Sequence, residues 1–182
     1  EGFPGNLLVN VTYSIDQADR LTIEYTAETD QATCLNLTQH SYFNLSGKAG
    51  TSVENHLLKI NADYFLPVND KIIPAGEFKS VQSTPFDFST FNTIGERIND
   101  TDTQLEHGKG YDHSYVLEKN HTPVLKEAAT ITEPESRRCI KVQTTEPGIH
   151  FYSGNYLSNE YAGKQNIPFQ KRNAFCLETQ HF

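Results

Sequence analysis

The chain has 182 residues, of which 36% are hydrophobic and 11% aromatic, so it is long enough to form one globular domain with a sizeable core. Fifteen Lys and Arg residues against 23 Asp and Glu residues give a formal net charge of -8. This charge repels nucleic acids and anionic membrane surfaces, so we expect neither as a partner. No apolar stretch approaches the roughly 20 residues of a membrane-spanning helix.

The three cysteines, Cys34, Cys139 and Cys176, are odd in number and widely spaced. This pattern favours neither a disulfide framework nor a paired-cysteine metal site, and reduced thiols predict a cytoplasmic protein. A leader peptide upstream would not be visible, because the chain begins at Glu1 and contains no Met.

Five N-x-S/T sequons occur in a chain that is rich in Asn, Ser and Thr. We interpret them as chance matches, and glycosylation of a secreted protein is the alternative. They begin at Asn10, Asn36, Asn44, Asn99 and Asn120.

In residues 7–28, apolar and polar side chains alternate on both sides of the polar turn DQADR, which predicts a β-hairpin. Further strands are expected at residues 34–43 and 56–62. Residues 64–112 are irregular and predict long loops across the rim of a sheet, where binding sites are commonly assembled. The best helical candidate is STFNTIGERI at residues 89–98, but it is short and contains a glycine, so it predicts one turn or a capped loop.

A second hairpin is expected to join LKEAATI and CIKVQTT through the turn TEPESRR. Since no segment keeps a helical apolar stripe over three turns, the predicted fold class is an all-β antiparallel sandwich, with residues 1–182 as a single domain. The remaining strand candidates are residues 113–118, 149–153 and 174–181.

The stretch NLTQHSYFNLSG places His40 among hydroxyl groups and aromatic rings. In a strand, His40 would share a face with Thr38 and Tyr42, opposite Leu35 and Leu37. Uncharged hydrogen-bonding groups of this kind suit the hydroxyls of a sugar. A structural histidine whose hydrogen bonds are satisfied within the sheet is the alternative, because a single His is weak evidence.

Asp112 follows a glycine-rich loop at the start of a predicted strand. A carboxylate there can accept two hydroxyl hydrogen bonds, although composition alone favours a turn or capping aspartate. We expect no metal site beside it, because no second ligand lies at a recognisable spacing and His107, His113 and His121 are predicted loop residues.

Glu178 lies in the apolar stretch AFCLETQHF, on the strand face that carries Cys176 and Gln180. Burial would raise the pKa of its carboxyl toward the range of a general base, provided that neighbouring donors keep it ionised. A charge on an edge strand that opposes aggregation is the alternative.

The chain resembles the galactose mutarotase (aldose 1-epimerase) family over nearly its whole length. Five stretches carry the resemblance, in the order expected for that family: GFPGNL, LNLTQHSYFNLSG, GYDHSYVL, TTEPGIHFYSGN and FCLETQ. The resemblance implies an antiparallel supersandwich fold and the interconversion of α and β anomers of free aldoses such as galactose and glucose, with no cofactor or metal.

The resemblance also implies roles for particular residues. Glu178 matches the general base and His40 the general acid, acting across the cleft, while Asp112 matches a residue that holds sugar hydroxyls. Tyr42 and His150 are expected to contact the sugar, although His150 stands where the family commonly carries a glutamine, which affects sugar preference more than the reaction. Phe151 is expected in the core, with packing against the sugar as the alternative.

The family pattern begins before GFPG, with an Arg and a second His that contact the sugar, and it continues past ETQ. The resemblance therefore implies that this chain is about half of such an enzyme, and that a missing or companion segment supplies the rest, or that the piece is inactive alone. Two other functions stay open: a glycoside-cleaving enzyme that uses Glu178 and Asp112 as a carboxylate pair, and a non-catalytic carbohydrate-binding or regulatory module.

Overall fold

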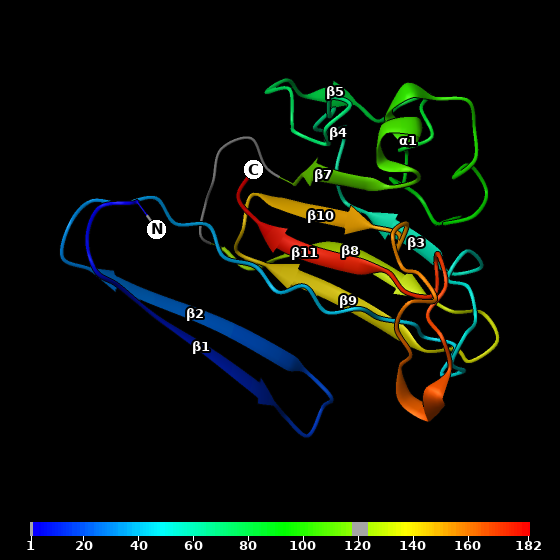
Figure 1. Ribbon diagram of the computed structural model, residues 1–182, viewed down its shortest axis with the longest axis horizontal. Helices are drawn as coiled ribbons and strands as arrows, with labels where there is room; N and C mark the ends of the chain where they lie inside the picture. Colours follow the sequence, from blue (N-terminus) through cyan, green and yellow to red (C-terminus); the bar gives the residue numbers. More distant parts are fainter. Residues whose placement is uncertain (1, 118–123) are drawn as a thin grey trace. The chain divides into compact units, whose positions relative to one another are not determined.

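The computed structural model describes residues 2–117 and 124–182, and the chain divides into two compact units, Glu1–Leu37 and Thr38–Phe182. The first unit contains an antiparallel hairpin of β1 (Leu7–Ile15) and β2 (Leu21–Thr29) (Figure 1), which confirms the first predicted hairpin. At its turn, the carboxylate of Asp16 accepts hydrogen bonds from the backbone N–H groups of Ala18 and Arg20. That residues 1–182 belong to one incomplete domain stays a prediction.

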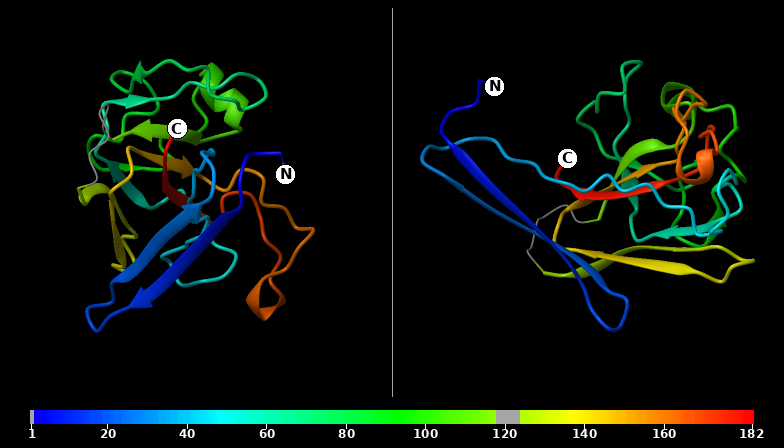
Figure 2. Two further views of the ribbon diagram at one scale, coloured as in Figure 1. Left: turned by 90° about the vertical axis from the view of Figure 1, so that its left-hand side faces the viewer. Right: turned by 60° about the horizontal axis from the view of Figure 1, so that its bottom comes forward.

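The second unit contains two antiparallel sheets, so the predicted all-β class is confirmed. The strand order is β11-β10-β7-β4-β5 in one sheet and β6-β3-β8-β9 in the other, and Figures 1 and 2 show β10 and β11 in one layer and β8 and β9 in the other. The strands are β3 (Leu57–Ile60), β4 (Tyr64–Phe65), β5 (Lys79–Ser80), β6 (Asn92–Thr93), β7 (Asp112–Val116), β8 (Lys126–Thr132), β9 (Cys139–Thr144), β10 (Gly148–Tyr152) and β11 (Cys176–Gln180). The pair β8 and β9 is the second predicted hairpin.

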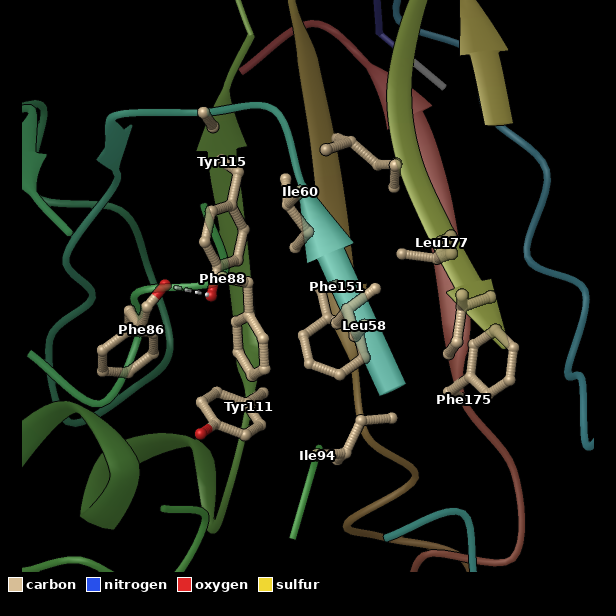
Figure 3. Packing of buried hydrophobic residues seen from close by; sticks show 14 of the residues in the cluster. Leu58, Ile60, Phe86, Phe88, Ile94, Tyr111, Tyr115, Phe151, Phe175 and Leu177 are labelled. Atoms are coloured by element: carbon tan, nitrogen blue, oxygen red, sulfur yellow. Dashed lines mark hydrogen bonds between the residues drawn. The ribbon is translucent and has the colours of Figure 1, made fainter. Parts of the chain in front are cut away.

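Buried hydrophobic side chains from both sheets form one core cluster (Figure 3). On β10, Ile149 and Phe151 are fully buried in this cluster, and alternation therefore directs His150 to the opposite face of the sheet. Burial of each such side chain contributes about 1.5–3 kcal/mol to folding. Phe151 thus belongs to the core, as expected.

The predicted strand at residues 34–43 is wrong, because only Phe43 in this segment makes a backbone bridge, to Phe175. Side chains replace the ladder hydrogen bonds: Thr38 Oγ1 donates to the carbonyl of Thr179, and Gln39 Nε2 donates to the carbonyl of Leu177. These two side-chain hydrogen bonds hold the segment beside β11. Since the segment is not a strand, its other side chains need not alternate between two faces.

Residues 89–98 contain β6 and turns rather than a helical turn, because Ile94 and Ile98 are drawn into the core from this loop. The α-helix α1 (Thr103–Gly108) lies further along and begins at Asp102, whose carboxylate accepts from two backbone N–H groups. A 3-10 turn, η1, spans Lys164–Asn166. No helix in the described ranges is long and apolar enough to cross a membrane.

Two histidines that were expected in loops lie in regular structure, so that expectation is wrong for both, whereas the predicted strand at 113–118, which also contains His113, is confirmed by β7. His107 belongs to α1 and its Nδ1 lies 2.9 Å from the carbonyl oxygen of Val68. His113 is a fully buried residue of β7, with Nε2 3.2 Å from Oε1 of Gln104. His121 lies outside the described residues.

The structure also describes the cysteines and the sequon asparagines other than Asn120. Cys34 and Cys139 are exposed, Cys176 is buried, and all three are free; the cytoplasmic location stays a prediction. Asn44 Nδ2 donates to the carbonyls of Thr51 and Asn173, and Asn99 Oδ1 accepts from Arg172. A glycan on Asn44 would replace one of the Nδ2 hydrogens that make these hydrogen bonds, which favours the interpretation of that sequon as a chance match.

Candidate active site

Three neighbouring strands, β7, β10 and β11, carry polar and aromatic side chains on the face that points away from the core. Their antiparallel register sets these residues in two rows across the sheet. In one row His150 is opposite Glu178 and Ser114, and in the other Tyr152 is opposite Cys176 and Asp112.

A pocket of about 390 Å³ lies on this face, within the range of roughly 300–1,000 Å³ that small-molecule sites occupy. All five residues that the sequence singled out for the site contribute to its lining. The lining residues are His40, Tyr42, Asp112, His150, Tyr152, Tyr156, Glu178 and Gln180.

His40 and Glu178 are direct neighbours: Nε2 of the imidazole lies 3.5 Å from Oε1 of the carboxylate. The Glu178 side chain is 8% exposed, so it is not an exposed charge on an edge strand. The His40 side chain is 52% exposed, so it is not a structural histidine enclosed in a sheet. Burial raises the pKa of the Glu178 carboxyl, while His150 and His40 act in the opposite direction. The two groups are in contact, not on opposite sides of a cleft.

Asp112, His150 and Ser114 form a chain of hydrogen bonds across β7 and β10. Nε2 of His150 lies 2.8 Å from Oδ1 of Asp112, and its Nδ1 lies 3.0 Å from Oγ of Ser114. In the neutral imidazole, Nε2–H donates to the carboxylate and Nδ1 accepts from the serine hydroxyl. A carboxylate has two oxygens, so Asp112 can orient His150 with one and accept a ligand hydroxyl with the other.

Aromatic rings line the pocket together with the acidic groups. His40 and Tyr42 stack with ring centroids 5.0 Å apart, and Tyr152 meets each of them edge-on at 6.2 Å. The backbone N–H of Tyr156 donates to the hydroxyl of Tyr152, which fixes the position of that ring. Ring faces and edges of this kind suit the C–H surfaces of a pyranose, while the hydroxyls meet the polar groups.

Tyr152 and Tyr156 were not identified from the sequence. Tyr152 could have been, because it shares the strand face of His150 in GIHFY. Tyr156 comes from the turn after β10 and carries no periodic signal.

A buried polar network holds the start of β7 in place. Asn155 Nδ2 donates to the carbonyls of Gly108 and Tyr111, and Ser153 Oγ donates to Oδ1 of Asn155. Gly110 has a φ of +134°, and a Cβ there would collide with the amide of Asn155. The motifs GYDH and YSGN therefore fix the backbone that presents Asp112 to the pocket.

The comparisons with known proteins agree with this fold. A family model described as "Aldose 1-epimerase" matches residues 1–182. The chain is 40% identical to a galactose mutarotase of Homo sapiens over 182 residues, which are 100% of this chain and 51% of the relative. It is also 40% identical to an aldose 1-epimerase of Escherichia coli (strain K12) over 180 residues, which are 99% of this chain and 51% of the relative.

Among solved structures, an aldose epimerase homologue from C. elegans superposes with a TM-score of 0.85 at 31% identity, covering 98% of this chain and 52% of the other. A galactose 1-epimerase from Lactobacillus acidophilus NCFM gives a TM-score of 0.82 at 31% identity over 98% of this chain and 50% of the other. The fold is thus that of the galactose mutarotase-like β-sandwich proteins. The chain belongs to the aldose 1-epimerase family, and it spans about half the length of the relatives it matches.

Proposed function

We propose that this chain is the part of an aldose 1-epimerase that carries its general acid, its general base and a carboxylate that holds sugar hydroxyls. The substrate would be a free aldose such as galactose or glucose, and no cofactor is part of the proposal. The observation that carries it is the 3.5 Å contact between His40 and Glu178 in a pocket that also presents Asp112.

The proposed reaction moves two protons between atoms that are close in space. The Glu178 carboxylate removes the proton of the anomeric hydroxyl while protonated His40 gives its proton to the ring oxygen. The bond from C1 to the ring oxygen breaks and the carbonyl forms at C1. Rotation about the C1–C2 bond and closure by the reverse proton transfers then give the other anomer.

The adjacency of the two groups fits this chemistry. The anomeric oxygen and the ring oxygen are both bonded to C1, so the acid and the base must reach two neighbouring atoms. Burial also raises the pKa of Glu178, and a more basic carboxylate is a better proton acceptor near neutral pH. General acid–base groups of this kind contribute about 10²- to 10⁴-fold in rate.

Asp112 and His150 are proposed to orient the sugar. The 2.8 Å contact between them leaves the second carboxylate oxygen of Asp112 for a sugar hydroxyl. Both imidazole nitrogens of His150 are hydrogen-bonded to Asp112 and Ser114, so His150 would orient the sugar by holding Asp112 in place. Tyr42 would cover one face of the ring, given its stacking on His40.

Polarimetry tests the proposal. Freshly dissolved α-galactose should relax to its anomeric equilibrium faster with the protein than in buffer, and methyl α-galactoside should show no change because it has no anomeric hydroxyl to deprotonate. Release of methanol or reducing sugar from the glycoside would indicate a glycoside-cleaving enzyme instead. Binding of galactose without any acceleration would indicate a carbohydrate-binding module.

A further inference from the structure

Three side chains with different metal-binding atoms converge beside the pocket. His40, Cys176 and Glu178 each offer one ligand atom, and these three atoms lie within 4.8 Å of one another. His40 comes from the segment beside β11, whereas Cys176 and Glu178 are two residues apart on β11 and share its outer face. From these positions we propose a binding site for a borderline-soft divalent cation, of which Zn²⁺ is the best match.

The spacing is close to what a tetrahedral zinc site needs. Three atoms that are mutually within 4.8 Å all lie within about 2.8 Å of a common centre, and zinc takes nitrogen, sulfur and oxygen ligands at about 2.0–2.3 Å. A movement of less than about 1 Å by each ligand atom closes the site. The His40 side chain, which is 52% exposed, can make the largest adjustment.

The donor set also matches zinc. One imidazole, one thiolate and one carboxylate form a mixed N, S, O set that leaves a fourth position for water or a hydroxyl, and the thiolate disfavours Mg²⁺ and Ca²⁺. On binding, the S–H bond of Cys176 is replaced by a bond to zinc and the proton passes to solvent.

The charges around the site favour a cation. The thiolate and the carboxylate together neutralise Zn²⁺, so the occupied site carries no net charge in a place where isolated charges are costly. Asp112, another carboxylate that lines the pocket with Glu178, adds to the negative charge beside the site.

A consequence follows for catalysis, and it rests on the proposed function. Zinc at this site would hold both the proposed acid and the proposed base, so zinc and sugar would compete and zinc would inhibit epimerisation. Binding itself does not depend on activity, so the two claims can be tested separately.

Cobalt substitution gives a direct readout of the site. Co²⁺ added to the reduced protein should produce a thiolate-to-cobalt charge-transfer band in the near ultraviolet, and Zn²⁺ should displace it. Cys176→Ser should abolish the band and weaken Zn²⁺ binding, measured by titration calorimetry, at least about tenfold, because one of three ligands loses its sulfur. Cys139→Ser, which alters an exposed free cysteine, should leave the charge-transfer band and the Zn²⁺ affinity unchanged.

His40→Ala is the second variant, chosen because His40 is half-exposed and its replacement does not disturb the core. It should weaken Zn²⁺ binding by a similar factor. An unchanged band in Cys176→Ser, or Zn²⁺ affinity unaffected by either variant, would overturn the site. If Zn²⁺ binds as proposed but galactose does not compete with it, the zinc site stands and the proposed sugar site fails.

Discussion

His40 Nε2 lies 3.5 Å from Glu178 Oε1, although 138 positions in the sequence separate the two residues. The contact exists because the segment beside β11 is held by the Thr38 and Gln39 side chains, which bond the carbonyls of β11 on either side of Glu178. A buried carboxylate and a half-exposed imidazole are thereby fixed as a pair, and the proposed mechanism uses this pair to take a proton from one sugar oxygen and give a proton to its neighbour.

The buried Glu178 carboxylate should cost the fold some stability. Because its pKa is raised above the ordinary value of 4.5, the folded protein binds more protons than the unfolded chain just above pH 4.5, and stability falls as the pH rises through that window. Glu178→Gln should therefore be more stable than wild type at pH 7, by on the order of 1 kcal/mol, and equally stable near pH 3.5.

Urea unfolding at both pH values measures this difference. Glu160→Gln, which changes an exposed carboxylate, is the control and should leave the free energy of unfolding unchanged at both pH values. A Glu178→Gln variant that is less stable than wild type at pH 7 would show that the carboxylate stabilises the fold.

His113 should make the fold sensitive to acid. Burial, followed by the neighbouring His150 and His107, lowers the pKa of His113 from 6.5 to about 3, so the unfolded chain binds the extra proton first as the pH falls. Stability is fully present above about pH 6.5 and declines below it by up to about 1.4 kcal/mol per pH unit. His113→Gln should give a shallower decline between pH 6.5 and 4, as measured by urea midpoints. If stability declined with falling pH as steeply in His113→Gln as in wild type, His113 would not be the cause of the acid sensitivity.

The Asp112–His150–Ser114 chain should affect substrate binding more than the chemical step. Ser114→Ala removes one neutral hydrogen bond to His150, worth about 1 kcal/mol, and should raise KM for galactose about fivefold with little change in kcat. His150→Ala should raise KM by about tenfold or more, because Asp112 loses its direct partner, and His150→Gln should recover part of the loss since an amide can still donate. A fall in kcat with KM unchanged would place His150 in the proton transfers.

Gly110 should tolerate substitution poorly. Gly110→Ala places a Cβ against the amide of Asn155 and keeps a φ of +134°, whereas Gly76→Ala also has a positive φ of +84° but no atom within 4 Å of the new carbon. The Gly76 variant should lose about 1 kcal/mol and the Gly110 variant about 1–3 kcal/mol more, as measured by thermal unfolding. Equal losses would mean that the Asn155 network adapts freely.

The sequence predicted both hairpins and the strands β3, β7, β10 and β11, because alternation along each strand is a local property of the chain. The two-residue strands β4, β5 and β6 lie in residues 64–112, which were expected to be long loops. The predicted strand at 34–43 is wrong for a physical reason. The carbonyls of β11 accept hydrogen bonds from the side chains of Thr38 and Gln39 and not from the backbone of a paired strand. No alternation of residues along the chain indicates such a replacement of backbone by side-chain hydrogen bonds. The candidate at 89–98, expected to be one helical turn or a capped loop, forms β6 and turns. Its buried Ile94 and Ile98 are four positions apart, which is also a helical spacing.

The site could be predicted only in part. His40, Tyr42, Asp112, His150 and Glu178 all line the pocket, and the ordered motifs located them before their spatial relation was known. The 3.5 Å contact of His40 with Glu178 and the place of Tyr156 depend on the packing of segments far apart in the chain. Tertiary packing, and not sequence spacing, brings such residues together.

The central claim is that Glu178 and His40 act as base and acid on a free aldose, and the polarimetric relaxation of α-galactose tests it most directly. The rate with wild type is compared with the rates of Glu178→Gln, His40→Asn and the control Glu160→Gln. The account predicts that each site variant slows the relaxation by about 10²- to 10⁴-fold while the control keeps the wild-type rate. Relaxation as fast with Glu178→Gln as with wild type would contradict it.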